Sequence, residues 1–478
     1  MQTANKHTIT DLHQMQSLPL KDKIRMTQRR IEEWYEHYDG NVYLSFSGGK
    51  DSTVLLHLVR EMYPDVPAVF VNTGLEYPEI VKFVKTFDNV EIIRPKMSFV
   101  QVIKKYGYPM FSKEVSECVY GARKYLTSLR ESGMLDRPTD RPTDRPDTIP
   151  LLVRKSYWNG NISEASNRES IICTTTRQTE CWERADMESI TRNSRGGLTA
   201  SGVKLEELAN TLNERMVNKI GGQNQRLAIM LGMLTNDKSH PIKANIPEND
   251  RSMFSQERYS FLLDAPFEVS NRCCNVMKKE PAHRFQKETG RNPITAQMAS
   301  ESRLRTQKWL QNGCNGFDLT RPMSNPMSFW TEQDVLLYIY ENYIQLASVY
   351  GDVVKETEVE GQLDLDDLGL FDIGRPTLKT TGCSRTGCFA CGFGAHLEKP
   401  SECRIQRTID FSNPKFADWQ LRGGAFDERG LWVPKCGLGY WFVYLWIRKY
   451  GGFQMYFPNE EYYIEKYSTP DTDKYLKG

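Results

Sequence analysis

The residue types that could do chemistry are most concentrated in one short segment, Tyr-Leu-Ser-Phe-Ser-Gly-Gly-Lys-Asp-Ser-Thr, which runs from Tyr43 to Thr53. Its two adjacent glycines let the backbone approach a ligand closely, because neither carries a Cβ. Ser47 and Ser52 add hydroxyl donors, as does the final threonine. Lys50 adds a positive charge, and the exposed N–H groups of a helix start favour an anion. The segment therefore predicts a site that holds phosphate groups.

Apolar patterns on both sides of this segment indicate which elements position it. The sequence predicts, in chain order, a helix, a strand, a helix, a strand, a helix and a strand, over the ranges 21–38, 43–46, 54–59, 68–71, 78–87 and 90–95. Such alternation is typical of a parallel sheet that is covered on both faces. Ligands of these sheets lie beyond the carboxyl ends of the strands, where Ser47 and Thr73 are expected.

The rest of the chain suggests four regions in an α/β protein with a doubly wound parallel sheet. The sheet domain is expected to have two halves, 1–130 and 251–345, separated by a largely helical insertion at 131–250. The insertion begins with a low-complexity near-repeat at 136–147, and apolar residues at helical spacing follow at 205–234. We expect the insertion to serve oligomer or partner contact, or to be an expansion without a fixed structure. The last region, 346–478, is cysteine-rich.

Bulk properties narrow the class of protein. At 478 residues the chain is too long for one ordinary core, and its net charge of +1 argues against a surface built for nucleic acid. No segment is long and apolar enough to cross a membrane, so a cytoplasmic protein is expected. Eleven cysteines in a reducing compartment suggest a metal rather than disulfides.

The cysteines cluster in one place, which is the second strong motif of the sequence. Cys388 and Cys391 form a Cys-x-x-Cys pair, Cys383 precedes the pair, and Cys403 follows it. Four thiolates at this spacing can close a tetrahedral zinc site or hold an iron–sulfur cluster. His396 could replace one thiolate.

The phosphate-binding segment resembles the PP-loop of the ATP pyrophosphatase superfamily, whose members cleave ATP between its α and β phosphates. With its later motifs the chain resembles the phosphoadenosine phosphosulfate (PAPS) reductase family. These motifs are Asn-Thr-Gly at 72–74 with Glu76, Ser-Lys at 112–113, Cys-Cys-x-x-x-Lys-Lys-x-Pro at 273–281, Ser-Glu-Ser-Arg at 300–303 and Trp-Thr-Glu-Gln-Asp-Val at 330–335. The resemblance covers about half the chain.

The resemblance implies a set of site residues. Nucleotide phosphates are expected at Ser45, Ser47, Gly48, Gly49, Lys50, Asp51 and Ser52, and adenine and ribose at Val71, Asn72, Thr73 and Gly74. A distal phosphate or sulfate is expected at Lys113, Lys278, Arg303 and Arg305, because arginine binds such groups with a planar, charged fork. Lys50, Asp51, Arg303 and Arg305 are the expected catalytic residues, with Mg²⁺ bridging the phosphates beside Asp51.

The resemblance also bears on the metal. The segment 384–391 is similar to the cluster segment of the PP-loop component of DNA phosphorothioation systems, which carries a 4Fe–4S cluster. Adenylyl-sulfate reductases hold such a cluster with a Cys-Cys pair and a later Cys-x-x-Cys, which here are Cys273, Cys274, Cys388 and Cys391. The resemblance thus favours iron–sulfur over zinc and leaves both ligand sets open.

Three functions follow as hypotheses. The first is an enzyme that uses ATP to adenylate an acceptor and releases pyrophosphate, in sulfur transfer or nucleic-acid modification. A sulfur-donor protein such as a cysteine desulfurase, a nucleic-acid acceptor and a homo-oligomer are its possible partners. The second is a PAPS or adenylyl-sulfate reductase, for which Cys436 is the available late thiol, although core-like aromatic residues follow it. The third is a nucleotide-binding sensor or scaffold without chemistry.

Overall fold

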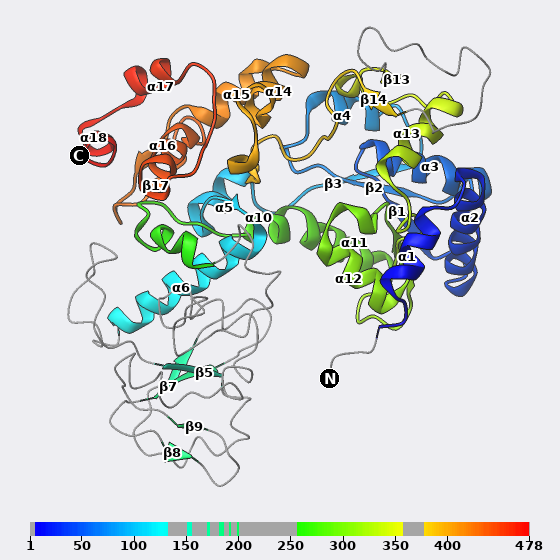
Figure 1. Cartoon of the computed structure of the whole chain (residues 1–478), viewed down its shortest axis with the longest axis horizontal. Coiled ribbons are helices and arrows are strands. Elements are labelled where there is room, and N and C mark those ends of the chain that lie inside the picture. The colour runs from blue at the N-terminus through cyan, green and yellow to red at the C-terminus, as the bar shows by residue number, and fades with distance from the viewer. Residues whose placement is uncertain are drawn as a thin grey trace. The chain divides into compact units, whose positions relative to one another are not determined.

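The computed structural model describes residues 5–131, 151–154, 170–172, 181–185, 191–192, 198–199, 256–356 and 377–477. They belong to two compact units, many of whose elements are labelled in Figure 1. Unit 1 comprises Met1–Phe99, Cys274–Ala390 and Arg404–Asp418, and unit 2 comprises Val100–Cys273, Cys391–Cys403 and Trp419–Gly478. Both units are discontinuous in sequence, whereas the four predicted regions follow chain order.

Unit 1 is built on one six-stranded sheet. The spatial order of its strands is β11 (Asn315–Gly316), β12 (Met323–Ser324), β10 (Asn292–Ile294), β1 (Val42–Ser45), β2 (Ala68–Val71) and β3 (Val90–Ile93). All neighbours are parallel except the edge pair β11 and β12. The predicted α/β class with a mostly parallel sheet is therefore confirmed.

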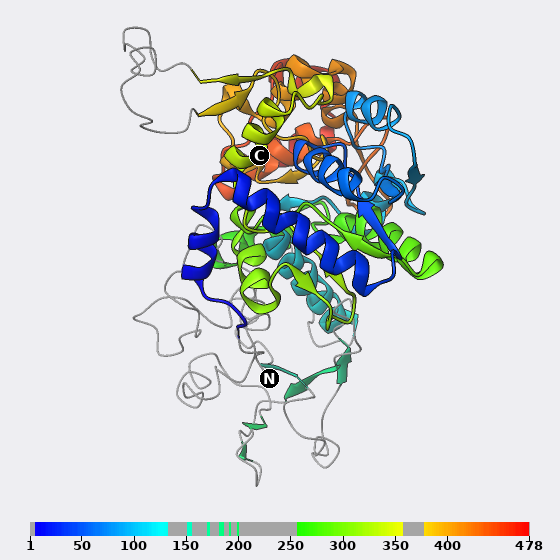
Figure 2. The same cartoon turned by 90° about the vertical axis from the view of Figure 1, so that its right-hand side faces the viewer.

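Helices cover both faces of this sheet. The helices of unit 1 include α1 (Ile9–Gln16), α2 (Leu20–His37), α3 (Lys50–Met62), α4 (Pro78–Val84), α11 (Glu280–Thr289), α12 (Arg303–Asn312), α13 (Glu332–Glu341) and α14 (Arg404–Phe411). On one face, Phe285 of α11 packs against Tyr43 and Val69. The alternate strand residues Leu44 and Phe70 point to the other face and are also buried. The dark blue helix α2 faces the viewer in Figure 2.

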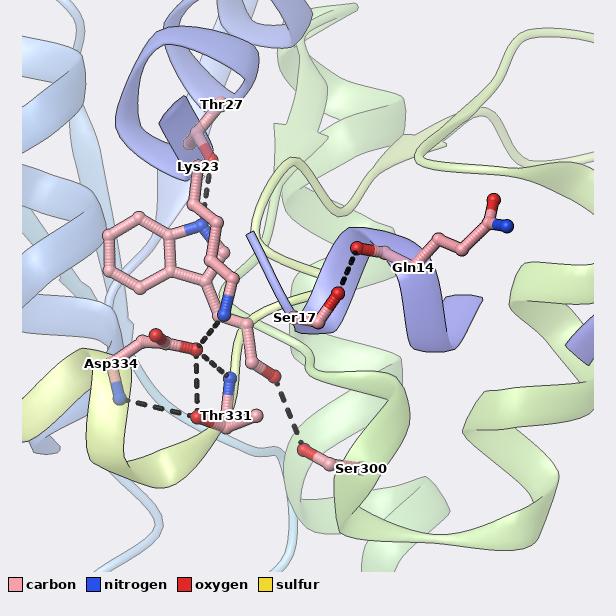
Figure 3. A network of polar contacts seen from close by, with 8 residues as sticks. Gln14, Ser17, Lys23, Thr27, Ser300, Thr331 and Asp334 are labelled. Carbon is pink, nitrogen blue, oxygen red and sulfur yellow. Dashed lines mark hydrogen bonds and ion pairs between the residues drawn. The ribbon is translucent and has the colours of Figure 1, made fainter. Parts of the chain in front are cut away.

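A buried polar network ties α2 to α13 (Figure 3). The ammonium of Lys23 lies 2.6 Å from the carboxylate of Asp334, and both side chains are almost wholly buried. The same carboxylate accepts the backbone N–H of Thr331, whose hydroxyl in turn caps α13. A threonine cap followed by the acidic residues Glu332 and Asp334 in the first turn is a favourable helix start.

Unit 2 has an aromatic core. Its helical segments include α6 (Lys113–Glu131), η5 (Gln256–Asp264), α16 (Tyr440–Gly451), α17 (Glu460–Tyr467) and α18 (Pro470–Leu476). Two short sheets accompany them. In one, β4 (Met110–Phe111) pairs with β15 (Gly392–Phe393), and in the other, β16 (Ala425–Phe426) pairs with β17 (Trp432–Val433). Phe111 contacts Tyr259 and Phe453, and Phe267 contacts Trp446. Elements distant in sequence thus share one core.

The insertion expected at 131–250 differs from its prediction in the part that the structure describes. There the residues after α6 form strands: β5 (Leu151–Arg154), β7 (Cys181–Ala185) and β6 (Ser170–Ile172) in one antiparallel sheet, and β8 (Thr191–Arg192) with β9 (Leu198–Thr199). The helices expected at 205–234 and the near-repeat at 136–147 lie outside the described residues. Among the helices of the described segments, none combines the length and apolar composition needed to cross a bilayer.

Candidate functional site

The glycine-rich loop of unit 1 lies between the end of β1 and the start of α3. Strand β1 has β2 on one side and β10 on the other, so the loop leaves the sheet where the direction of winding changes. This is where open α/β sheets bind ligands. Gly48 has a φ of 70°, and a Cβ there would lie 2.7 Å from a methyl group of Ile80 on α4. A side chain at this position would therefore be strained and would clash with the helix.

The hydroxyl groups of the loop bond largely to the loop itself. The oxygens of Ser47 and Ser52 lie 2.9 Å apart, and the Ser52 hydroxyl also lies within 3.0 Å of the Gly49 carbonyl. The Thr53 hydroxyl donates to that same carbonyl. These bonds fix the shape of the loop, so the hydroxyls expected to face a phosphate are already partnered in the protein alone.

Lys50, the first residue of α3, is buried with its ammonium held by two groups from the second half of unit 1. The nitrogen lies 2.9 Å from the carboxylate of Glu332 and donates to the carbonyl oxygen of Ser384, also at 2.9 Å. Glu332 is the first residue of α13 and its side chain is 41% exposed. The loop lysine is thus oriented before any ligand arrives.

Asp51 lies next to this lysine and is largely buried. Its oxygen Oδ1 is buried without a hydrogen-bond partner. Burial raises the pKa of the Asp51 carboxyl, and the neighbouring Glu332 raises it further, while the charges of Lys50, Arg385 and Arg305 lower it. An unsatisfied buried carboxylate oxygen costs free energy, and such groups are concentrated at functional sites.

A tyrosine and a threonine close over the other glycine of the loop. The hydroxyl of Tyr350 lies 2.5 Å from that of Thr386 and accepts the backbone N–H of Lys50 at 3.4 Å. A Cβ on Gly49 would lie 3.3 Å from the Tyr350 hydroxyl. The small size of Gly49 therefore lets these two side chains approach the start of α3.

The end of β2 carries the residues expected to approach adenine and ribose. Val71 is the last strand residue, and the N–H of Asn72 donates to the carbonyl of Ile93 on β3. Both the N–H and the hydroxyl of Thr73 donate to the carboxylate of Glu76. The side chain of Asn72 accepts the N–H of Gly74. This turn is therefore fixed by its own side chains beside the glycine-rich loop.

The distal cations expected from the sequence have different surroundings. Arg303 begins α12, and Arg305, two residues further along, pairs with Glu301. Burial lowers the pKa of Arg305, as does the charge of Arg385, whereas Asp51 raises it. Lys278 lies 3.8 Å from Glu76. Lys113 begins α6 and belongs to unit 2. Arg305 belongs to unit 1, as the loop does, so the two expected cations are in different units.

The expected metal ligands divide between the units. Cys383 and Cys388 belong to unit 1, and Cys391 and Cys403 to unit 2. In the metal-free protein, burial raises the pKa of the Cys383 thiol to about 11. Over the described ranges no three His, Cys, Asp or Glu side chains are grouped as a metal site. The four-cysteine centre stays a prediction.

The alternative ligand set divides in the same way, with Cys274 in unit 1 and Cys273 in unit 2. Within unit 1, Cys388 is the main cause that raises the pKa of Lys278, and Cys274 contributes as well. These two sulfurs therefore share one cationic neighbour. In unit 2, His396 lies among aromatic rings, and burial, followed by the charge of Arg258, lowers its pKa to about 4.

Local sequence patterns do not indicate several of the residues that surround the loop. Tyr350, Ser384, Arg385 and Thr386 carry no local pattern that points to a phosphate site, because only the fold brings them to Lys50. For Glu332, the sequence gives no assignment to the phosphate site. Its position in the Trp-Thr-Glu-Gln-Asp-Val motif was the one available signal.

Comparison with known proteins gives a family match over both halves of the chain. Residues 41–125 and 213–392 match the phosphoadenosine phosphosulfate reductase domain. A PAPS reductase of Serratia proteamaculans is 32% identical over 103 residues, covering 20% of this chain and 40% of that protein. An uncharacterised protein of Methanocaldococcus jannaschii is 33% identical over 101 residues, covering 19% of this chain and 24% of that protein.

These curated relatives are matched over less than half of their own length. Among solved structures, a PAPS reductase from Candida auris in a phosphate complex aligns with 78% of this chain and 97% of its own. Its sequence identity is 12% and its TM-score is 0.27, a value too low to establish a shared fold.

Proposed function

The chain belongs to the phosphoadenosine phosphosulfate reductase domain family, and on that premise we propose that it binds ATP at the Ser47–Ser52 loop and cleaves it to AMP and pyrophosphate, activating an acceptor. The observation that carries this proposal is the set of charged groups at one loop: a buried lysine already oriented by two partners, a buried carboxylate with an unpartnered oxygen, and Arg305 beside it.

The chemistry required of these residues is electrostatic. Cleavage between the α and β phosphates builds negative charge on the leaving pyrophosphate, and cations fixed in advance stabilise that charge without reorganising. Lys50 is fixed by Glu332 and Ser384, and Arg305 by Glu301. No cysteine is needed at the reacting phosphorus.

Asp51 fits the Mg²⁺ that such nucleotides carry. Its buried Oδ1 has no protein partner, and carboxylate oxygen is a ligand that Mg²⁺ prefers. Asp51 would hold the ion together with the phosphates, and the ion would neutralise phosphate charge. The protein's own part in the reaction is to position the nucleotide against Lys50 and Arg305 and to limit the access of water. An iron–sulfur or zinc centre has no role in this scheme.

A PAPS or adenylyl-sulfate reductase is the second candidate, favoured by the names of the relatives. It needs a thiolate that reaches the sulfate and then leaves for reduction. Cys436 is exposed, but its backbone has a φ of 62° and only three residues separate it from the largely buried helix α16. This placement in unit 2 gives the thiol little freedom to move, which favours the first proposal.

A paired assay separates these functions. Wild-type protein with Mg²⁺ and ATP is screened for pyrophosphate release with sulfur-donor and nucleic-acid acceptors, and the Lys50→Ala variant serves as the control. In parallel, PAPS or adenylyl sulfate is offered with reduced thioredoxin. We expect pyrophosphate release that depends on Lys50. Sulfite formation at rates typical of enzymes, on the order of 1 s⁻¹, would establish the reductase instead. Tight ATP binding without turnover across the acceptor screen would favour a nucleotide sensor or scaffold.

A further inference from the structure

A segment of unit 1, residues 381–389, crosses the glycine-rich loop as a strap. At its start, the N–H groups of Thr381, Gly382 and Cys383 donate to carbonyls of residues 349–352 at 2.8–2.9 Å. At its end, the N–H of Phe389 donates to the carbonyl of Leu75, just after β2. The strap is therefore fixed by backbone hydrogen bonds on both sides of the loop, and its middle must pass over the start of α3.

The middle of the strap contacts the loop directly through Ser384 and indirectly, through Tyr350, at Thr386. Ser384 accepts from the Lys50 ammonium through its carbonyl, and Thr386 contacts Tyr350, whose hydroxyl accepts the backbone N–H of Lys50. Arg385 lies between these two residues and is exposed. Within the described part of the chain, no hydrogen bond or ion pair holds its guanidinium. Its backbone is thus anchored while its side chain remains able to move.

The charges of Arg385 and Arg305 both act on the carboxylate of Asp51. It lowers the pKa of the Asp51 carboxyl, and it lowers the pKa of Arg305, which means that the two guanidinium groups repel each other. Glu301 pairs with Arg305 and Glu332 pairs with Lys50. Two arginines that repel each other beside an anion-binding loop gain most from an anion placed between them.

We propose that Arg385 of the strap and Arg305 of α12 together bind the terminal oxyanion group of the nucleotide, beyond its α-phosphate, and so select nucleotides that carry such a group. The proposal rests on the proposed function, since it assigns a subsite of the same nucleotide site. The group is either the β,γ-diphosphate of ATP or the sulfate of adenylyl sulfate. Both present several charged oxygens to the planar fork of an arginine.

Calorimetry with ATP, adenylyl sulfate and AMP tests the proposal on wild-type protein and on the variants Arg385→Ala, Arg385→Lys and Arg29→Ala. Charged hydrogen bonds of this kind correspond to a loss of about 10- to 100-fold in affinity. We expect Arg385→Ala to lose that much for ATP or adenylyl sulfate, whichever binds tighter to wild type, and to change AMP binding less than about threefold. Arg385→Lys should be intermediate, because it keeps the charge but not the fork.

Arg29→Ala is the matched control, because Arg29 is an exposed arginine of α2 in the same unit. It should bind all three ligands as wild type does. Equal affinity of Arg385→Ala and wild type for ATP and adenylyl sulfate would overturn the proposal, as would an equal loss for AMP, which would indicate a structural role of the strap. Wild-type protein that binds no adenine nucleotide would refute the proposed function. In that case, calorimetry with inorganic pyrophosphate tests the subsite by itself. Pyrophosphate binding that is lost in Arg385→Ala supports the subsite, and a wild-type protein that binds no pyrophosphate overturns it.

Discussion

The ammonium of Lys50 lies 2.9 Å from the carboxylate of Glu332, so the cation of the phosphate-binding loop is partly neutralised by the protein itself. A phosphate that approaches Lys50 meets a carboxylate at the same place. Glu332 is 41% exposed, which means that water screens the pair and lets the carboxylate move aside. The pair therefore orients the lysine and moderates its affinity for anions.

Replacement of Glu332 by Gln should strengthen ATP binding by about fivefold, because the competing charge is removed and a partly exposed ion pair is worth roughly 1 kcal/mol or less. Calorimetry at constant Mg²⁺ measures this change. Glu341→Gln, at the other end of α13, is the control. Weaker ATP binding by Glu332→Gln would contradict the argument and would place this carboxylate among the groups that hold the nucleotide.

The Lys50→Ala and Asp51→Ala double variant should lose measurable ATP binding in calorimetry. The change removes the loop cation and the carboxylate suited to Mg²⁺, while the backbone of the loop remains. Circular dichroism should show a folded protein, since the hydroxyl bonds of Ser52 and Thr53 to Gly49 are kept. Unchanged affinity in a folded double variant would show that the nucleotide binds elsewhere.

The buried pair of Lys23 and Asp334 should respond asymmetrically to substitution (Figure 3). Lys23→Met leaves a buried carboxylate without its cation, so the free energy of unfolding should fall by about 3–5 kcal/mol. Adding Asp334→Leu should recover much of the lost stability, because no buried charge then remains. About 1 kcal/mol should stay lost, because Asp334 no longer forms its hydrogen bonds at the start of α13. Urea unfolding measures both. Additive losses in the double variant would show that the pair is not coupled.

His396 should make the stability of metal-free protein depend on pH. Its pKa is lowered to about 4 in the folded protein from 6.5, so the unfolded state binds the proton first as the pH falls. The contribution of His396 to the free energy of unfolding is therefore complete above pH 6.5 and is lost progressively as the pH falls towards 4. We expect a loss of about 2 kcal/mol between pH 7 and pH 5 in wild type. His396→Gln should reduce this loss, and identical pH profiles of the two proteins would contradict the argument.

The cysteine spacing predicts bound metal in protein purified without oxygen. Elemental analysis should find iron, and visible absorption should show an iron–sulfur cluster, both lost in the Cys388→Ser and Cys391→Ser double variant. Single serine variants of Cys403 and Cys273 then decide between the two ligand sets. Zinc without iron would indicate a zinc site in place of the iron–sulfur cluster. Wild-type protein that contains neither metal would refute the predicted metal centre.

The sequence determined the local part of the site because one continuous segment contains it. Strand β1, the turn at Gly48 and the start of α3 follow from an apolar run, a doubled glycine and a helical pattern between residues 42 and 62, and the cap at Thr331 is equally local. The strand and helix alternation likewise predicted a mostly parallel sheet. It did not predict the strands in the described part of the insertion, where short segments of ordinary composition pair with distant partners.

The tertiary structure alone decided what surrounds the loop. Glu332, Tyr350 and the strap residues Ser384 to Thr386 reach Lys50 from far along the chain, and no period or spacing in their own segments indicates it. Their contacts depend on where α13 and the strap lie against the sheet, which is fixed by packing over the whole of unit 1. Local patterns reflect backbone preferences of neighbouring residues, whereas the charge balance of a site is the sum over residues that only the fold brings together.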